Sequence, residues 1–103
     1  MPIGNDYDQP RKNYFSSEDS SFASGDSPAT LDVFGTINRE SIKGTIDCDG
    51  AGDITVSLSS DGTTYGNNIT LKKYEQLDLT GSVVRKIKIT HTGTDSAYRV
   101  RCS

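Results

Sequence analysis

The chain has 103 residues, of which 32% are hydrophobic, and its 14 acidic and 11 basic residues give a net charge of −3. This length suits one domain, and no segment approaches the roughly 20 consecutive apolar residues that a membrane-spanning helix needs. The N-terminus has neither the basic nor the apolar region of a secretory signal, so we expect synthesis in a cytoplasm and no membrane partner.

Residues 1–29 are predicted to form an extended N-terminal arm. Prolines and glycines interrupt this segment, and no helical or strand period runs through it. It holds five acidic and two basic residues, whereas the rest of the chain holds nine of each. A neutral body with an acidic arm does not suit nonspecific nucleic-acid binding, so we expect no nucleic-acid partner.

Large apolar or aromatic side chains punctuate this polar arm. A free linker does not need them, so we interpret them as anchors that seat in a partner protein when the arm becomes ordered on binding. The alternative is that they cover the chain's own domain. These residues are Ile3, Tyr7, Tyr14, Phe15 and Phe22.

Residues 30–103 are predicted to form one all-β domain. Apolar and polar residues alternate in short segments, which is typical of antiparallel sheets with one buried face. Turn sequences rich in Asp and Gly separate these segments. About seven strands at this spacing predict a small antiparallel β-sandwich. In chain order, the predicted strands are 30–36, 41–48, 53–59, 68–72, 75–80, 83–90 and 97–102.

The shared register of these strands also predicts which residues fill the core. The predicted core residues are Ile42, Ile46, Ile54, Val56, Leu58, Leu71, Leu79, Ile87, Ile89 and Val100. Cys48 and Cys102 fall on the same inward face, and we expect both to be buried thiols. The alternative is a disulfide between them, which would require adjacent strand ends and oxidising conditions.

Few residues are able to carry chemistry. His91 is the single histidine, and it has no evident nucleophile or acid partner. The aspartates at 47, 49 and 53 resemble the start of a calcium loop, but Ala51 occupies a ligand position and the later glutamate is missing. We therefore predict a protein that is not an enzyme and has no metal or cofactor. A loose calcium site at these aspartates is the alternative.

Basic residues point outward from the last two predicted strands. If these strands pair, the side chains form one basic stripe. Such a stripe is either an ordinary solvated face or a docking surface for an acidic partner. The acidic arm of a neighbouring copy would fit it, which makes a homo-oligomer a candidate assembly. The residues of this stripe are Lys86, Lys88, Arg99 and Arg101.

Four stretches, ITVSLSSDGTTYG at 54–66, ITL at 69–71, LDLTG at 77–81 and IKITH at 87–91, resemble small β-sandwich proteins of tailed-phage particles. The resemblance implies a structural component of the virion, assembled in the host cytoplasm. Such a component would be a capsid decoration (cement) protein or a head or tail accessory. Its partners would be the major capsid protein or other head or tail proteins, held through the arm.

The hairpin around Tyr65 supports an alternative function. A Ser-x-Asp-Gly sequence followed by an aromatic residue is also common in carbohydrate-binding β-sandwiches. The chain nevertheless has no Trp, and its aromatic residues form no evident stacking platform for a sugar. A carbohydrate-binding module is therefore the second hypothesis, beside the virion protein.

Overall fold

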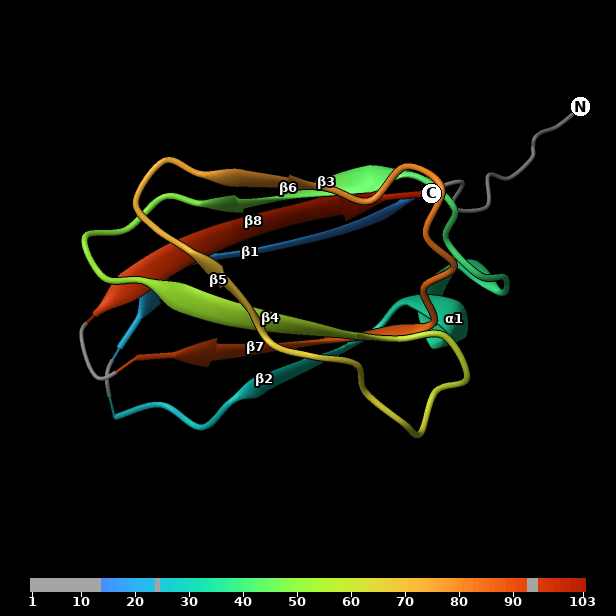
Figure 1. The fold of residues 1–103 in the computed structure, drawn as a ribbon, viewed down its shortest axis with the longest axis horizontal. Coiled ribbons are helices and arrows are strands. Elements are labelled where there is room, and N and C mark those ends of the chain that lie inside the picture. The colour runs from blue at the N-terminus through green and yellow to red at the C-terminus, as the bar shows by residue number, and fades with distance from the viewer. Residues whose placement is uncertain (1–13, 24, 93–94) are drawn as a thin grey trace, which may run out of the picture.

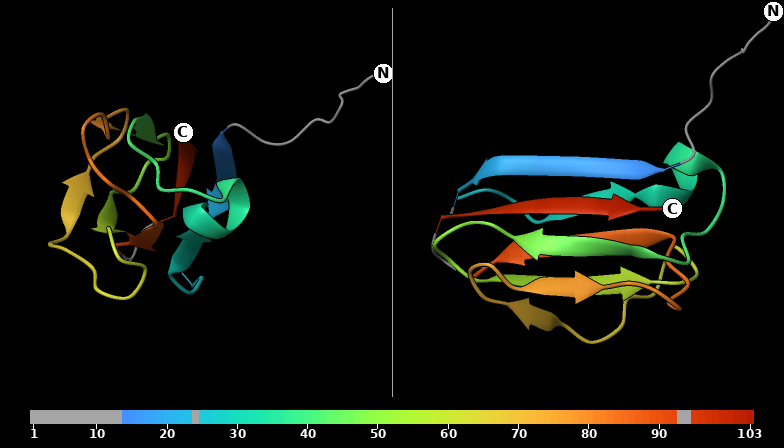
Figure 2. Two further views of the ribbon diagram at one scale, coloured as in Figure 1. Left: turned by 90° about the vertical axis from the view of Figure 1, so that its right-hand side faces the viewer. Right: turned by 90° about the horizontal axis from the view of Figure 1, so that it is seen from above.

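The computed structural model describes residues 14–23, 25–92 and 95–103. Within them, two four-stranded antiparallel sheets form the two layers of a sandwich, with one short helix at one end (Figures 1 and 2). The predicted all-β sandwich is confirmed, with eight strands where about seven were expected. No helix in the described part of the chain is long and apolar enough to cross a membrane.

Except for β4 and β5, which follow one another in the second sheet, consecutive strands lie in different sheets. The first sheet consists, in spatial order, of β1 (Phe15–Phe22), β8 (Ser96–Cys102), β3 (Gly44–Cys48) and β6 (Gln76–Asp78). The second sheet consists of β2 (Ala29–Asp32), β7 (Lys86–His91), β4 (Ile54–Ser59) and β5 (Ile69–Leu71). The helix α1 (Val33–Ile37) follows β2 directly.

The core lies between the sheets and is filled by alternate residues of the strands. Most of the predicted core residues are buried there, with 5% or less of each side chain exposed. They are Ile46, Ile54, Val56, Leu71, Leu79, Ile87, Ile89 and Val100. Leu58 is half-buried and packs against this cluster.

Strand β1 is part of the sandwich, so the predicted arm boundary at residue 29 was wrong. β1 pairs antiparallel with β8, beginning with Phe15 opposite Cys102. Phe15 and Phe22 are only 7% and 2% exposed, and the Phe22 ring packs edge-on against Tyr98 with centroids 5.3 Å apart. Burial of these two rings outweighs the polar character of the residues between them.

The strand predicted at 30–36 ends at Asp32, because its second half forms α1. The Asp32 carboxylate caps the helix by accepting a hydrogen bond from the Gly35 amide at 2.9 Å. Asn38 ends the helix in the left-handed conformation, with a φ of 64°. Val33 and Ile37 are buried one helical turn apart, so this segment follows the helical period rather than the strand period.

Ile42 is 60% exposed, so its predicted place in the core was wrong. The backbone amides of Ile42 and Lys43 both donate to the carbonyl oxygen of Ser103, at 3.0 and 3.3 Å. Two residues therefore oppose one, which is the arrangement of a β-bulge. The bulge shifts the register by one residue, so that Ser41 is buried and Ile42 faces outward.

Both cysteines are buried free thiols. Cys48 lies opposite Tyr98 in the paired strands β3 and β8, whereas Cys102 lies opposite Gly44 at the other end of the ladder. Strands rise about 3.4 Å per residue, which separates the thiols by about 13 Å. Because a disulfide requires Cα atoms within about 7 Å, this fold does not allow the bond. Burial also raises the pKa of the Cys102 thiol.

Candidate protein-binding surface

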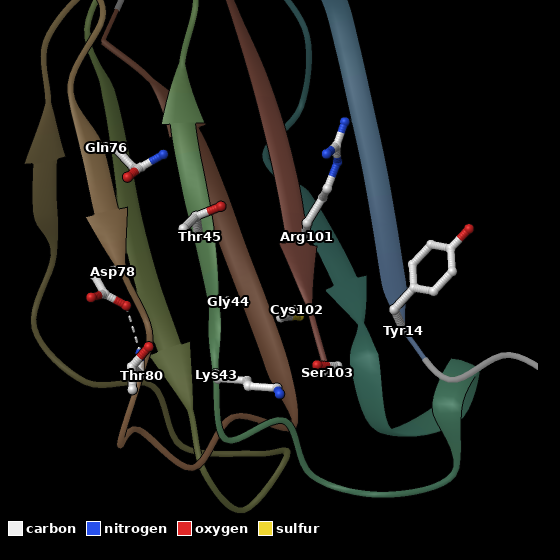
Figure 3. Close-up of a pocket in the computed structure, with 10 residues that line it drawn as sticks. All are labelled: Tyr14, Lys43, Gly44, Thr45, Gln76, Asp78, Thr80, Arg101, Cys102 and Ser103. Carbon is white, nitrogen blue, oxygen red and sulfur yellow. Dashed lines mark hydrogen bonds between the residues drawn. The ribbon is translucent and has the colours of Figure 1, made fainter.

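The outer face of the first sheet is a polar surface that four neighbouring strands build together (Figure 3). Alternate residues of each strand point to this face, because successive side chains of a strand project to opposite sides. They form cross-strand rows. One row consists of Ser16, Arg101, Thr45 and Asp78, and the next consists of Glu18, Arg99, Asp47 and Gln76.

A groove of about 550 Å³ lies on this face, near the C-terminal end of β8. Tyr14 lines it beside the start of β1, and its side chain is 59% exposed. Lys43, just before β3, and Arg101 of β8 also line it (Figure 3). The groove therefore combines an exposed aromatic ring with two cationic side chains.

The acidic side chain of the groove has a hydrogen-bond partner within the fold, whereas the two basic side chains do not have one among the described residues. The Asp78 carboxylate accepts a hydrogen bond from the Thr80 backbone amide at 2.9 Å, and this contact lowers the pKa of Asp78. The side chains of Lys43 and Arg101, by contrast, make no hydrogen bond or ion pair with any residue that the structure describes. The groove thus offers a ligand two positive charges that no described residue pairs.

Arg99 stands beside the groove but is used within the fold. Its Nε donates to the Asp49 carboxylate at 2.6 Å, and its guanidinium lies 3.7 Å from the Asp47 carboxylate. These contacts raise the pKa of Arg99. They also occupy two of the three aspartates considered as calcium ligands. Within residues 14–23, 25–92 and 95–103, no group of three or more His, Cys, Asp or Glu side chains is placed to hold a metal ion.

The predicted basic stripe does not form. Strands β7 and β8 lie in different sheets, so Lys86 and Lys88 are separated from Arg99 and Arg101 by the sandwich. The stripe depended on the pairing of these two strands, which follow one another in the sequence, and only about two-thirds of such strands are neighbours.

The structure buries two of the five predicted anchors and leaves one exposed, and the other two lie outside the described residues. Ile3 and Tyr7 lie outside the described residues. The structure contradicts the role of Phe15 and Phe22 as anchors for a partner, because both rings fill the chain's own core. Tyr14 is exposed and lies at the groove, so it is the described anchor that is accessible to a partner.

His91 occupies a structural position at the end of β7. Its Nε2 donates to the carbonyl oxygen of Asp26 at 2.7 Å. Its ring also packs edge-on against Phe22, with centroids 5.3 Å apart. These contacts fix the segment between β1 and β2 against the second sheet.

Tyr65, the aromatic residue of the hairpin that supports the carbohydrate alternative, has one face of its ring covered by Lys88. A pocket of about 400 Å³ lies beside Tyr65, lined by Asp61 and Thr64 among others. The Nζ of Lys88 lies 4.8 Å from the centroid of the Tyr65 ring. A cation over the ring is itself a favourable contact, so a sugar that stacks on this side would have to displace Lys88.

Asp61 organises the turn of the same hairpin. Its carboxylate accepts hydrogen bonds from the backbone amides of Thr64 and Thr63, each at 2.8 Å, and from the Ser59 hydroxyl at 3.1 Å. The two backbone amides are the main reason why the pKa of Asp61 lies far below its ordinary value. The hydrogen bonds favour the charged form of the carboxyl group.

We expect NMR titration of the Asp61 carboxyl carbon to give a pKa well below the value of about 3.9 that is usual for Asp. The pKa is lower in the folded state than in the unfolded state, so this group stabilises the fold above the unfolded pKa. The contribution is lost as the pH falls towards the folded pKa. Asp61→Asn should therefore weaken the pH dependence of unfolding below about pH 4. An ordinary pKa for Asp61 would contradict this account of the turn.

The outer face of the first sheet thus provides a groove, an exposed aromatic ring and two cations without an ion-pair partner in the described part of the chain. Arg and Tyr are enriched among the residues that dominate protein–protein binding. A guanidinium group can also hold a carboxylate through two parallel hydrogen bonds. Comparison with known proteins finds no matching family, no matching curated protein and no matching solved structure, so the function has to be inferred from this surface.

Proposed function

We propose that this chain is a non-enzymatic structural component of a viral particle that binds neighbouring virion proteins. It would act as a capsid decoration (cement) protein or as a head or tail accessory. The observation that carries the binding role is the groove, where Tyr14 is exposed and neither Lys43 nor Arg101 has an ion-pair partner among the described residues. The resemblance of residues 53–103 to phage β-sandwich proteins supports the setting in a virion.

The groove lies at the point where the described part of the chain begins, because Tyr14 is the first described residue and lines it. A partner seated in the groove is therefore within reach of residues 1–13, which supply the further anchors Ile3 and Tyr7. The two cations favour an acidic partner surface. Several weak contacts made at once explain how a small module can bind tightly to a repetitive particle surface.

We expect deletion of residues 1–13 to reduce the number of copies bound per particle, measured by quantitative mass spectrometry of purified virions. Tyr14→Asn should weaken binding by about 2 kcal/mol, or roughly thirtyfold, as for a typical aromatic hot spot. Tyr74→Asn is the matched control, because Tyr74 is 78% exposed and lies in the loop between β5 and β6, away from the groove.

Two outcomes would overturn the proposal. The first is full occupancy of particles by the protein that lacks residues 1–13 and carries Tyr14→Asn. The second is a parent protein that does not bind particles but is retarded in polysaccharide gels, while the Tyr65→Ala variant is not retarded. That second outcome would establish the carbohydrate-binding alternative.

A further inference from the structure

Within residues 14–23, 25–92 and 95–103, strand β1 is an edge strand of the first sheet with no strand on its outer side. It is eight residues long, whereas the other three edge strands, β6, β2 and β5, have three, four and three residues. Figure 2 shows it at the margin of the sheet, with no strand beyond it. An exposed edge of this length offers a row of unpaired N–H and C=O groups to another strand.

The hydrogen-bond pattern identifies which groups are unpaired. Ala97 of β8 accepts from the Asp49 amide at 2.9 Å, so the odd-numbered residues of β8 bond to β3. The even-numbered residues of β8 therefore bond to β1. Val100, one of them, lies opposite Ser17, so the N–H and C=O groups of Ser17 point towards β8. Backbone groups of successive strand residues point to opposite edges. The N–H and C=O groups of Ser16 and Glu18 consequently face the open edge.

The outer face of this edge carries opposite charges that lack ion-pair partners. Arg101 lies opposite Ser16 in the neighbouring strand, and its guanidinium extends towards β1 (Figure 3). Glu18 is exposed and forms no ion pair with a described residue. Arg99, its cross-strand neighbour, forms its ion pairs with Asp47 and Asp49. Glu18 acts on Arg99 only through a longer-range electrostatic interaction.

We propose that two copies of the chain pair antiparallel through their β1 edges, around a two-fold axis at Ser17. In this register Ser16 lies opposite the partner's Glu18. Both residues have their backbone groups on the open edge, so each such pair exchanges two main-chain hydrogen bonds. The partner's Glu18 also reaches across Ser16 to Arg101, and the symmetry repeats this ion pair on the other side.

Charge disfavours the registers whose axis lies further along β1 than Ser17. An axis at Glu18 or at Asp19 would place two identical carboxylates directly opposite each other, which destabilises a strand pair. The axis at Ser17 separates these carboxylates and places a cation within reach of each Glu18. The two four-stranded sheets then join into one continuous sheet.

Sedimentation velocity of the full chain over a range of concentrations tests the proposal. Glu18→Arg and Arg101→Glu should each raise the dissociation constant of the dimer at least tenfold, because like charges then face each other. An equimolar mixture of the two variants should form a heterodimer with the parent's affinity, since opposite charges are restored at both contacts. A parent that stays monomeric, or a mixture that does no better than the separate variants, would overturn the proposal.

A second pair of variants tests the main-chain contacts. Ser16→Pro removes an N–H group from the open edge but leaves the hydrogen bonds to β8 in place, so it should abolish the dimer. Ser16→Ala keeps the N–H group and should dimerise like the parent. Circular dichroism and thermal melting of both variants confirm that the monomer is folded. Equal dimerisation of the two variants would contradict pairing through β1. Arg101 also lines the groove, so Arg101→Glu is expected to alter particle attachment as well. Glu18→Arg, Ser16→Pro and Ser16→Ala lie outside the groove lining, and these three variants separate dimerisation from particle attachment.

Discussion

Removal of residues 1–29 is expected to abolish cooperative folding, whereas removal of residues 1–13 is expected to leave the sandwich intact. The longer deletion removes β1 and with it the buried rings of Phe15 and Phe22. Truncation of one such ring to Ala costs about 3–5 kcal/mol, and a whole domain is stable by only about 5–15 kcal/mol. The loss of both rings and of the hydrogen bonds to β8 is therefore expected to cost as much free energy as stabilises the whole domain.

Urea denaturation followed by circular dichroism distinguishes the two deletions. Phe22→Ala and Tyr14→Ala form a matched pair, because Phe22 is 2% exposed and Tyr14 is 59% exposed. We expect Phe22→Ala to lower the free energy of unfolding by about 3–5 kcal/mol and Tyr14→Ala by less than about 0.5 kcal/mol. A protein that lacks residues 1–29 and unfolds at the parent's urea concentration would show that β1 contributes nothing to stability.

Gly44→Ala is expected to lower the free energy of unfolding by about 2–6 kcal/mol. Gly44 has a φ of +152°, which L side chains rarely adopt. A Cβ atom there would also collide with the carbonyl oxygen of Arg101 and the Cβ of Cys102, where β3 and β8 pair. Backbone strain costs about 1–3 kcal/mol, and overpacking costs a further 1–3 kcal/mol or so.

Two other glycines serve to measure the cost of backbone strain without the cost of overpacking. Gly62 and Gly81 both have a φ of +87°, and a Cβ atom at either would meet nothing within 4 Å. Gly62→Ala and Gly81→Ala therefore report backbone strain alone, and we expect each to cost about 1–2 kcal/mol in urea denaturation. If Gly44→Ala costs no more than these controls, the strands have room to separate and close packing at Gly44 is unimportant.

The strands of the body could be predicted from the sequence because their alternation reflects one buried face. Ile54 and Val56 in β4 and Ile87 and Ile89 in β7 show this clearly, and all four are fully buried. β1 could not be predicted in the same way, because its positions between the two phenylalanines are Ser, Glu and Asp. An edge strand is covered incompletely, so it tolerates polar residues at inward positions such as the half-buried Ser17.

The candidate surface was less predictable than the strands. Tyr14 and Arg101 stood out in the sequence as an aromatic residue and an outward-facing cation, but Lys43 did not. The groove depends on which strands are neighbours, and it combines Tyr14 beside β1 with residues of β8 and β6. Periodicity reports the face on which a side chain lies and carries no information about the order of strands in a sheet.

The position of β8 between β1 and β3 has a consequence for the synthesis of the protein. β8 is the last of the described strands in the chain, yet both neighbours pair with it and not with each other. While a ribosome is still translating residues 96–102, Phe22 and Ile46 have no Tyr98 or Val100 to pack against. The nascent chain therefore exposes apolar surface until this strand emerges. Its first sheet then closes through contacts between distant parts of the sequence, which is a slow process.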